Sequence, residues 1–130
     1  MLIFGHRFIP SCRFYHVEDI DAITHTPSNS IIYLLFDEKN LDIIRHLKEN
    51  NIGFALAVNT IRDLIYAENL GASFIVTENT LAVNAQKIAE TYLFDAKILC
   101  HIQEESRIEA MAFEGIDGVV FPDAIIKITS

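Results

Sequence analysis

The sequence has few cysteines, few basic residues and no long apolar run, and each shortage excludes a class of protein. Its two cysteines, Cys12 and Cys100, allow one disulfide at most. Because 51% of the residues are hydrophobic, a chain of 130 residues can build a packed core without a disulfide or a metal staple. We therefore expect reduced thiols in a cytoplasmic protein.

No apolar run is long enough to cross a membrane. The longest has about six residues, whereas a membrane-spanning helix needs roughly 20. Near the N-terminus, His6 and Arg7 interrupt two short apolar patches, so this segment does not resemble a signal peptide. We therefore expect no membrane partner.

Basic residues are scarce and dispersed. The chain has 10 Lys and Arg residues against 18 Asp and Glu residues, which gives a formal net charge of −8. Such an acidic chain repels nucleic-acid phosphates and anionic membranes unless its cations are clustered, and the sequence shows no cluster. Glycine-rich loops of the kind that bind nucleotide phosphates are also missing. We expect neither a nucleic-acid partner nor a cofactor.

Short apolar runs alternate with amphipathic segments through most of the chain. The runs lie at 31–36, 53–58, 73–78, 97–102 and 118–122. Their starts are separated by 22, 20, 24 and 21 residues. Helical patterns fill the intervals, at about 38–50, 60–70, 80–92 and 103–114. Strands that alternate with helices at this spacing form parallel sheets, whose ligand sites lie at the carboxyl ends of the strands.

These units predict a single α/β domain over residues 1–130, with an irregular N-terminal strand segment at 1–30 and βα repeats at 31–122. We expect a mainly parallel sheet of five or six strands with helices outside. A closed barrel of eight βα units needs about 250 residues. The favoured architecture is therefore a partial TIM-barrel-like sheet, or half-barrel, and a flavodoxin-like sheet is the alternative.

Three segments resemble parts of a known family. They are IIYLLFDEKNLDIIRHLKE, GFALAVNTIRDLIYAENLGASFIVTE and CHIQEESRIEAMAFEGIDGVVFP. In order, they are similar to the second strand and its helix, to the third and fourth units, and to the Pro-Gly loop, helix and sixth strand of the 2-keto-3-deoxy-6-phosphogluconate aldolase family. The resemblance covers residues 31–122 and implies a TIM-barrel-like fold.

The residues that this family uses for class I aldolase chemistry are replaced. Its Schiff-base lysine lies two positions before a Phe-Pro pair, where this sequence has Val119. Its general-base glutamate corresponds to about Ile32, and its Arg-Thr pair to Phe36-Asp37. The family's phosphate-binding glycines have no counterpart here. Because a valine cannot attack a carbonyl, the resemblance implies the fold without the aldolase reaction.

Polar side chains collect where the predicted strands end. The candidate catalytic residues are His101, Glu78 and Asp37, because imidazole and carboxylate groups together suit general acid–base chemistry. The candidate ligand-binding residues are His6, Arg7, Asn59 and Thr77. Asp37, Asn59 and Glu78 also precede helices, so helix capping is the alternative role for each.

No metal site is predicted from the sequence. Cys12 and His16 have a ligand-like spacing, and Cys100 and His101 could supply two more ligands. Adjacent residues point to opposite faces of a strand, however, so Cys100 and His101 cannot both face one ion.

Two classes of function follow. In the first, the protein is a non-catalytic relative of the aldolases that binds a small anionic metabolite or a protein partner. In the second, it is a small lyase- or isomerase-type enzyme that uses the acid–base residues, and a purely structural role is a third possibility. An open half-barrel has exposed sheet edges, which favours a homo-oligomer, most simply a two-fold dimer. The alternative is a monomer whose N-terminal segment covers the gap.

Overall fold

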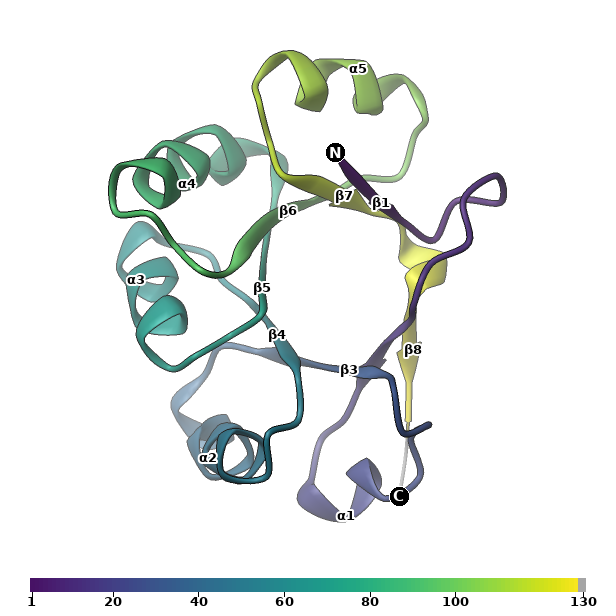
Figure 1. Cartoon of the computed structure of the whole chain (residues 1–130), viewed down its shortest axis with the longest axis vertical. Coiled ribbons are helices and arrows are strands. Elements are labelled where there is room, and N and C mark those ends of the chain that lie inside the picture. The colour runs from purple at the N-terminus through teal and green to yellow at the C-terminus, as the bar shows by residue number, and fades with distance from the viewer. Residues whose placement is uncertain (129–130) are drawn as a thin grey trace.

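The computed structural model describes residues 1–128, in which eight parallel strands form one curled sheet (Figure 1). From edge to edge the strand order is β1-β7-β6-β5-β4-β3-β2-β8. The strands are β1 (Leu2–Phe4), β2 (Phe14–His16), β3 (Ile31–Leu35), β4 (Phe54–Ala57), β5 (Phe74–Thr77), β6 (Lys97–His101), β7 (Gly118–Val120) and β8 (Ile125–Lys127). The helices are α1 (Ile20–Ile23), α2 (Leu41–Glu49), α3 (Ile61–Asn69), α4 (Asn79–Thr91) and α5 (Ser106–Phe113), with short 3-10 helices η1 (Glu38–Asn40) and η2 (Pro122–Ala124).

The prediction of an α/β half-barrel is confirmed, and the predicted five or six strands are corrected to eight. The difference comes from β1, β2 and β8, which have three residues each. Three residues are too few to show a strand period in the sequence. Among residues 1–128, β1 pairs only with β7, and β8 only with β2, so long-range packing rather than local pattern places these strands.

Aromatic side chains fill the inside of the curled sheet. The rings of Phe4, Phe14 and Phe74 lie with their centroids 5.0, 5.5 and 5.7 Å apart, in tilted or edge-to-face contacts. Smaller buried side chains from β4, β5, β6, β7 and η2 surround them: Ala55, Val76, Leu99, Val120 and Ala124. The interior is therefore a packed core, as in other small barrels, and not a channel.

Helices cover most of the outer face of the sheet (Figure 1). Buried side chains of α2, α3 and α4 pack in one cluster with β3, β4, β5 and β6, and Met111 of α5 packs with Cys100 and Val119. The side chain of Thr60 caps α3 by accepting the backbone N–H of Asp63 at 3.1 Å. Within residues 1–128, no helix has the length and apolar character that crossing a membrane requires.

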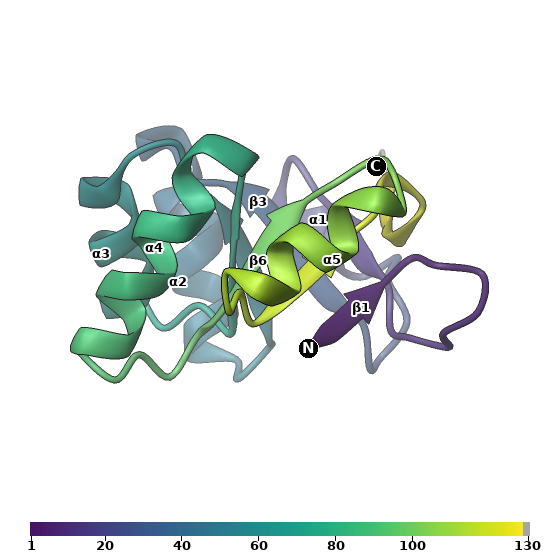
Figure 2. The same ribbon diagram turned by 90° about the horizontal axis from the view of Figure 1, so that it is seen from above.

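One wall of the described part of the chain, residues 1–128, has no α-helix. Strands β2 to β6 are each followed by a helix, whereas β1 leads into a loop at 5–13 and β7 leads into η2. The 5–13 loop connects β1, at one edge of the sheet, with β2, which lies next to the strand at the other edge. It lies opposite α2, α3 and α4 (Figure 2). We call residues 5–13 and 122–127 the helix-free wall. The N-terminal segment thus lies across the gap between the two edges of the sheet. This is the position that the sequence analysis gave it in the monomer, the alternative to a dimer.

Candidate functional site

Inward-facing positions at the carboxyl ends of the strands have polar side chains. Phe14 on β2, Val76 on β5 and Leu99 on β6 face the interior. Side chains at i and i+2 of a strand share a face, so His16, Glu78 and His101, each two positions later, lie on the same inner face. Residues in register on neighbouring parallel strands share a face as well, which places Tyr33 and Lys127 on either side of His16. We call His16, Tyr33, Glu78, His101 and Lys127 the mouth residues.

His101 and Glu78 form an acid–base pair in the mouth. Nδ1 of His101 lies 3.8 Å from Oε1 of Glu78, within ion-pair distance but too far for a hydrogen bond. The Glu78 side chain is 70% exposed and the His101 side chain 24% exposed. An imidazole and a carboxylate side by side are the groups that general acid–base chemistry uses.

Tyr33 is the mouth residue on β3, in register with His16 on β2. Its ring meets that of His16 edge to face, with the centroids 5.1 Å apart. Burial is the main cause of a raised pKa of the Tyr33 phenol, and the charge of Glu78 raises it further. Burial and then the charge of Lys127 lower the pKa of His16. The rings of Tyr33 and His16 are therefore uncharged at neutral pH. Lys127 has a partner of its own, since its Nζ lies 3.0 Å from Oε1 of Glu18.

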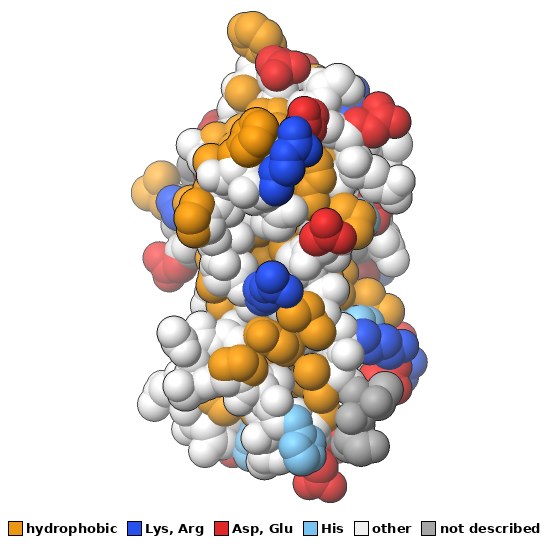
Figure 3. Space-filling model, turned by 90° about the vertical axis from the view of Figure 1, so that its right-hand side faces the viewer, with side chains coloured by type: hydrophobic (Ala, Val, Ile, Leu, Met, Phe, Trp, Pro, Cys, Tyr) orange, Lys and Arg blue, Asp and Glu red, His pale blue; other side chains and the backbone are white. Residues whose placement is uncertain are grey.

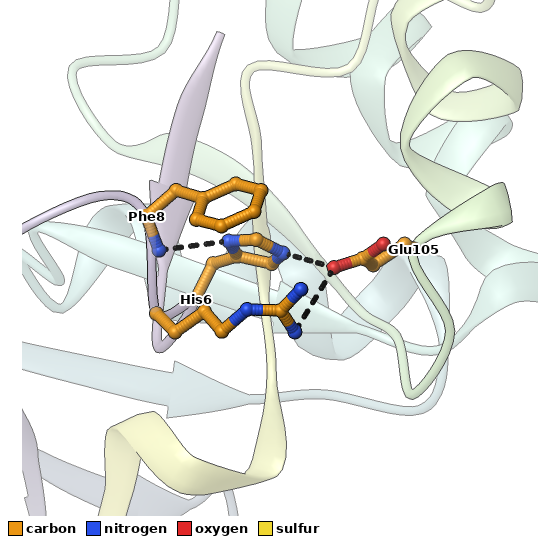
Figure 4. Close-up of polar contacts among 4 residues, drawn as sticks. His6, Phe8 and Glu105 are labelled. Atoms are coloured by element: carbon orange, nitrogen blue, oxygen red, sulfur yellow. Dashed lines mark hydrogen bonds and ion pairs between the residues drawn. The ribbon is translucent and has the colours of Figure 1, made fainter.

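His6, just after β1, is held in one tautomer (Figure 4). The backbone N–H of Phe8 donates to Nδ1 of His6 at 3.1 Å, so this nitrogen has no proton. Nε2 therefore holds the proton and donates it to Oε1 of Glu105, 2.6 Å away. This hydrogen bond is the main reason that the pKa of the Glu105 carboxyl lies below its usual range. With both ring nitrogens engaged, His6 positions the loop instead of acting as a base.

A cleft of about 360 Å³ opens next to His6, between the 5–13 loop and η2. The polar side chains that line it are His6, Arg7, Ser11, Arg13 and Asp123, and we call it the arginine cleft. Arg7 is 74% exposed, with Nη1 3.7 Å from Oε1 of Glu105. Oγ of Ser11 accepts the backbone N–H of Gly5 at 3.3 Å, which leaves the hydroxyl proton to donate to a ligand.

The structure brings together some of the residues that the sequence analysis singled out. His101 lies beside Glu78, and His6 and Arg7 line the arginine cleft and share Glu105 as a partner. Glu78 makes no side-chain hydrogen bond to the N-terminus of α4. Its carboxylate is therefore available to His101.

Other predicted residues lie apart from both groups. Asp37 caps η1, where its Oδ1 accepts the backbone N–H of Lys39 at 3.0 Å. The buried hydroxyl of Thr77 donates to the backbone carbonyl of Leu99 at 3.1 Å. Asn59 is exposed in the connection from β4 to α3. The side chains of Asp37 and Thr77 thus stabilise the fold locally.

Sequence reasoning misses six residues of these two groups. They are Ser11, Arg13, His16, Tyr33, Asp123 and Lys127. In β3, which has five residues, the spacing of Ile31 and Tyr33 is a strand period that could have indicated an inward-facing tyrosine. No local signal distinguishes Arg13, because a loop that crosses between sheet edges has no period.

The outer face of β6 and β7 is closed to covalent chemistry. Val119 and Cys100 are in register and fully buried. Burial raises the pKa of Cys100 to about 11, so its thiol stays protonated and unreactive at neutral pH. Both cysteines are free, and Cys12 is exposed. Between residues 1 and 128, no group of three or more His, Cys, Asp or Glu side chains is arranged to hold a metal ion.

Comparison with known proteins assigns no family. No protein-family model matches the chain. No curated protein matches it either. The geometry of the arginine cleft and of the mouth is therefore the basis for assigning a function.

Proposed function

We propose that this protein binds a small anionic molecule in the arginine cleft. The supporting observation is the lining of the cleft, in which Arg7 and Arg13 accompany one acidic residue, Asp123, and only Arg7 has an ion-pair partner, Glu105, among residues 1–128. Guanidinium groups present planar forks of N–H donors that match carboxylate and phosphate oxygens. A cleft of about 360 Å³ suits a ligand of metabolite size.

The cleft is formed before a ligand arrives. The Gly5–Ser11 hydrogen bond closes the base of the loop, and the two hydrogen bonds of the His6 ring fix the loop between them. Within residues 1–128, no ion pair holds the guanidinium of Arg13. An anion in the cleft can therefore pair with Arg13, whose charge is not already neutralised. Because the loop is already fixed, little ordering of it is needed on binding.

Replacing Arg13 with alanine is expected to weaken anion binding by about 10- to 100-fold, because hydrogen bonds to charged groups contribute roughly 1.5–3 kcal/mol each. Calorimetric titration with inorganic phosphate and with citrate, in a buffer without other oxyanions, measures the dissociation constant. Arg45→Ala is the matched control, since Arg45 is 67% exposed and lies on the distant helix α2.

Two results would contradict the proposal. One is no heat of binding for either anion with the unaltered protein. The other is an equal loss of affinity in Arg13→Ala and Arg45→Ala, because it would show that the anions respond to overall charge and not to the cleft.

A second candidate function is proton transfer in the mouth, and the 3.8 Å approach of His101 to Glu78 is the observation that favours it. The phenol of Tyr33, whose pKa is raised by burial and by the charge of Glu78, can donate a hydrogen bond to a carbonyl oxygen. Such a set suits removal of a proton next to a carbonyl, as lyases and isomerases require.

For this second candidate, the expected result is exchange of α-protons of small 2-oxo acids in deuterated water, followed by NMR. His101→Gln should lower the exchange rate by about 100-fold, within the range that a positioned general base contributes. His25→Gln, at an exposed position after α1, is the control. Exchange that is unchanged in His101→Gln would exclude this function.

The resemblance to the 2-keto-3-deoxy-6-phosphogluconate aldolase family supports a related proposal, that the two share a fold and not a reaction. The position of the family's lysine is Val119, buried on the outer face, so no Schiff base is proposed there. A cytoplasmic location, which would keep Cys12 reduced, and a homo-oligomeric state remain predictions of the sequence.

A further inference from the structure

We infer that the ligand of the arginine cleft is an aminocarboxylate, a molecule with an ammonium group as well as a carboxylate. This inference rests on the proposed function and names the chemical class of its ligand. Two side chains of opposite charge support it, because neither is paired within residues 1–128. Arg13 binds the carboxylate of such a ligand, and Asp123 binds its ammonium group.

The other charged side chains at the helix-free wall already have ion-pair partners. Nη1 of Arg7 lies 3.7 Å from Oε1 of Glu105, which also accepts the Nε2 proton of His6 (Figure 4). Farther along the wall, Lys127 is paired with Glu18. Figure 3 faces this side of the molecule and shows basic and acidic side chains among hydrophobic ones. With these pairs counted, the basic and acidic groups balance, so net charge alone does not select the ligand.

Arg13 and Asp123 are the charged side chains of the cleft that remain. Both line the same cavity of about 360 Å³, and they lie too far apart to pair with each other. Within residues 1–128, neither side chain makes a hydrogen bond or an ion pair. Both are exposed, so the cleft presents one free cation and one free carboxylate. A single molecule that has both charges can pair with the two together.

Asp123 has no capping role that would explain its carboxylate. It lies in η2, where no side chain caps the N-terminus. Asp37 differs, because its carboxylate caps η1 by accepting the backbone N–H of Lys39. An uncommitted carboxylate in an anion site repels a ligand that has only negative charge, and it attracts one that also has an ammonium group. Asp123 therefore determines which anions the cleft prefers.

The polar groups of the cleft match both ends of an aminocarboxylate. The guanidinium of Arg13 and the hydroxyl of Ser11 donate to carboxylate oxygens, and Asp123 accepts from the ammonium group. A second cavity, of about 500 Å³, also includes Asp123 and is lined farther on by Gln103 and Phe121. The rest of a larger aminocarboxylate therefore has room beyond Asp123.

Calorimetric titration with two matched pairs of ligands tests the inference. The pairs are free alanine with propionate, and 4-aminobutyrate with butyrate, and the members of each pair differ only by an ammonium group. The unaltered protein should bind at least one aminocarboxylate about fivefold more tightly than its partner, the upper end of what an exposed ion pair contributes. Asp123→Asn should abolish this gain. The same variant should bind phosphate at least as tightly as the unaltered protein, because a repelling carboxylate has been removed.

Asp95→Asn is the matched control, because it removes the same charge from an exposed position between α4 and β6. It should retain the preference for the aminocarboxylate. A preference that survives in Asp123→Asn, or that is lost equally in both variants, would overturn the inference. So would phosphate binding that depends on Arg13 without tighter binding of either aminocarboxylate, and the anion site would then stand. If phosphate, the carboxylates and the aminocarboxylates all fail to bind, the proposed function fails as well.

Discussion

Replacing Phe14 with alanine is expected to lower the free energy of unfolding by about 3–5 kcal/mol. Phe14 is fully buried, and its ring lies 5.0 Å from that of Phe4 and 5.7 Å from that of Phe74. Its neighbours belong to separate strands of a curled sheet, so they cannot move inward to fill the space without breaking strand pairing. The cavity would therefore persist, and its cost adds to the lost transfer free energy.

Urea unfolding followed by circular dichroism measures this loss. Phe113→Ala is the matched control, because the Phe113 side chain is 90% exposed and its removal should change stability by less than about 0.5 kcal/mol. If Phe14→Ala does not fold, Phe14→Leu provides a smaller deletion at the same position. Losses of equal size at positions 14 and 113 would show that the aromatic interior contributes no more than the surface.

Replacing Gly5 with alanine is the second substitution with a large expected effect, a loss of about 2–5 kcal/mol in the free energy of unfolding. Gly5 has a φ of +87°, which costs an L-residue about 1–2 kcal/mol. A Cβ at this position would lie 2.8 Å from the backbone nitrogen of Ala124 and 2.9 Å from its Cβ. Relieving such overpacking costs a further 1–3 kcal/mol or so.

Gly115→Ala separates the two contributions. Gly115 has a φ of +75°, but a Cβ there would have no neighbour within 4 Å. Its replacement should therefore show the backbone cost alone, and the difference between the two variants measures the contact between Gly5 and η2. Chemical unfolding measures both variants. If Gly5→Ala and Gly115→Ala lose the same free energy of unfolding, the residues around Gly5 shift to accommodate the added methyl group without further cost.

The repeating part of the fold could be predicted because its signals are local. The helical pattern at 60–70 corresponds to α3, whose first turn is capped by Thr60, and the apolar run at 73–78 contains β5. The short strands β1, β2 and β8 differ in this respect. Their positions depend on partners far along the chain, such as Ile125 beside Phe14, and no window of sequence contains that information.

The candidate site was predictable only where the chemistry lies directly after a strand. His101 is the last residue of β6, Glu78 follows β5, and His6 and Arg7 come after β1, so the rule that ligands lie at carboxyl ends finds them. The rule cannot find Arg13, which precedes β2 and reaches the cleft because the 5–13 loop returns beside Asp123. It also cannot tell a capping carboxylate such as Asp37 from a free one, since the difference is a single side-chain hydrogen bond.

The strand order also constrains the sequence of events in folding. Leu2, in the first strand, is in register with Gly118, 116 residues later, and β1 has no other neighbour in the sheet. During synthesis β1 must therefore wait until β7 has left the ribosome. Strands β3 to β6 pair with their neighbours in sequence and can assemble earlier at a smaller loop-closure cost. Insertion of Phe4 into the aromatic interior is consequently a closing step, in which residues from both ends of the chain take their places together.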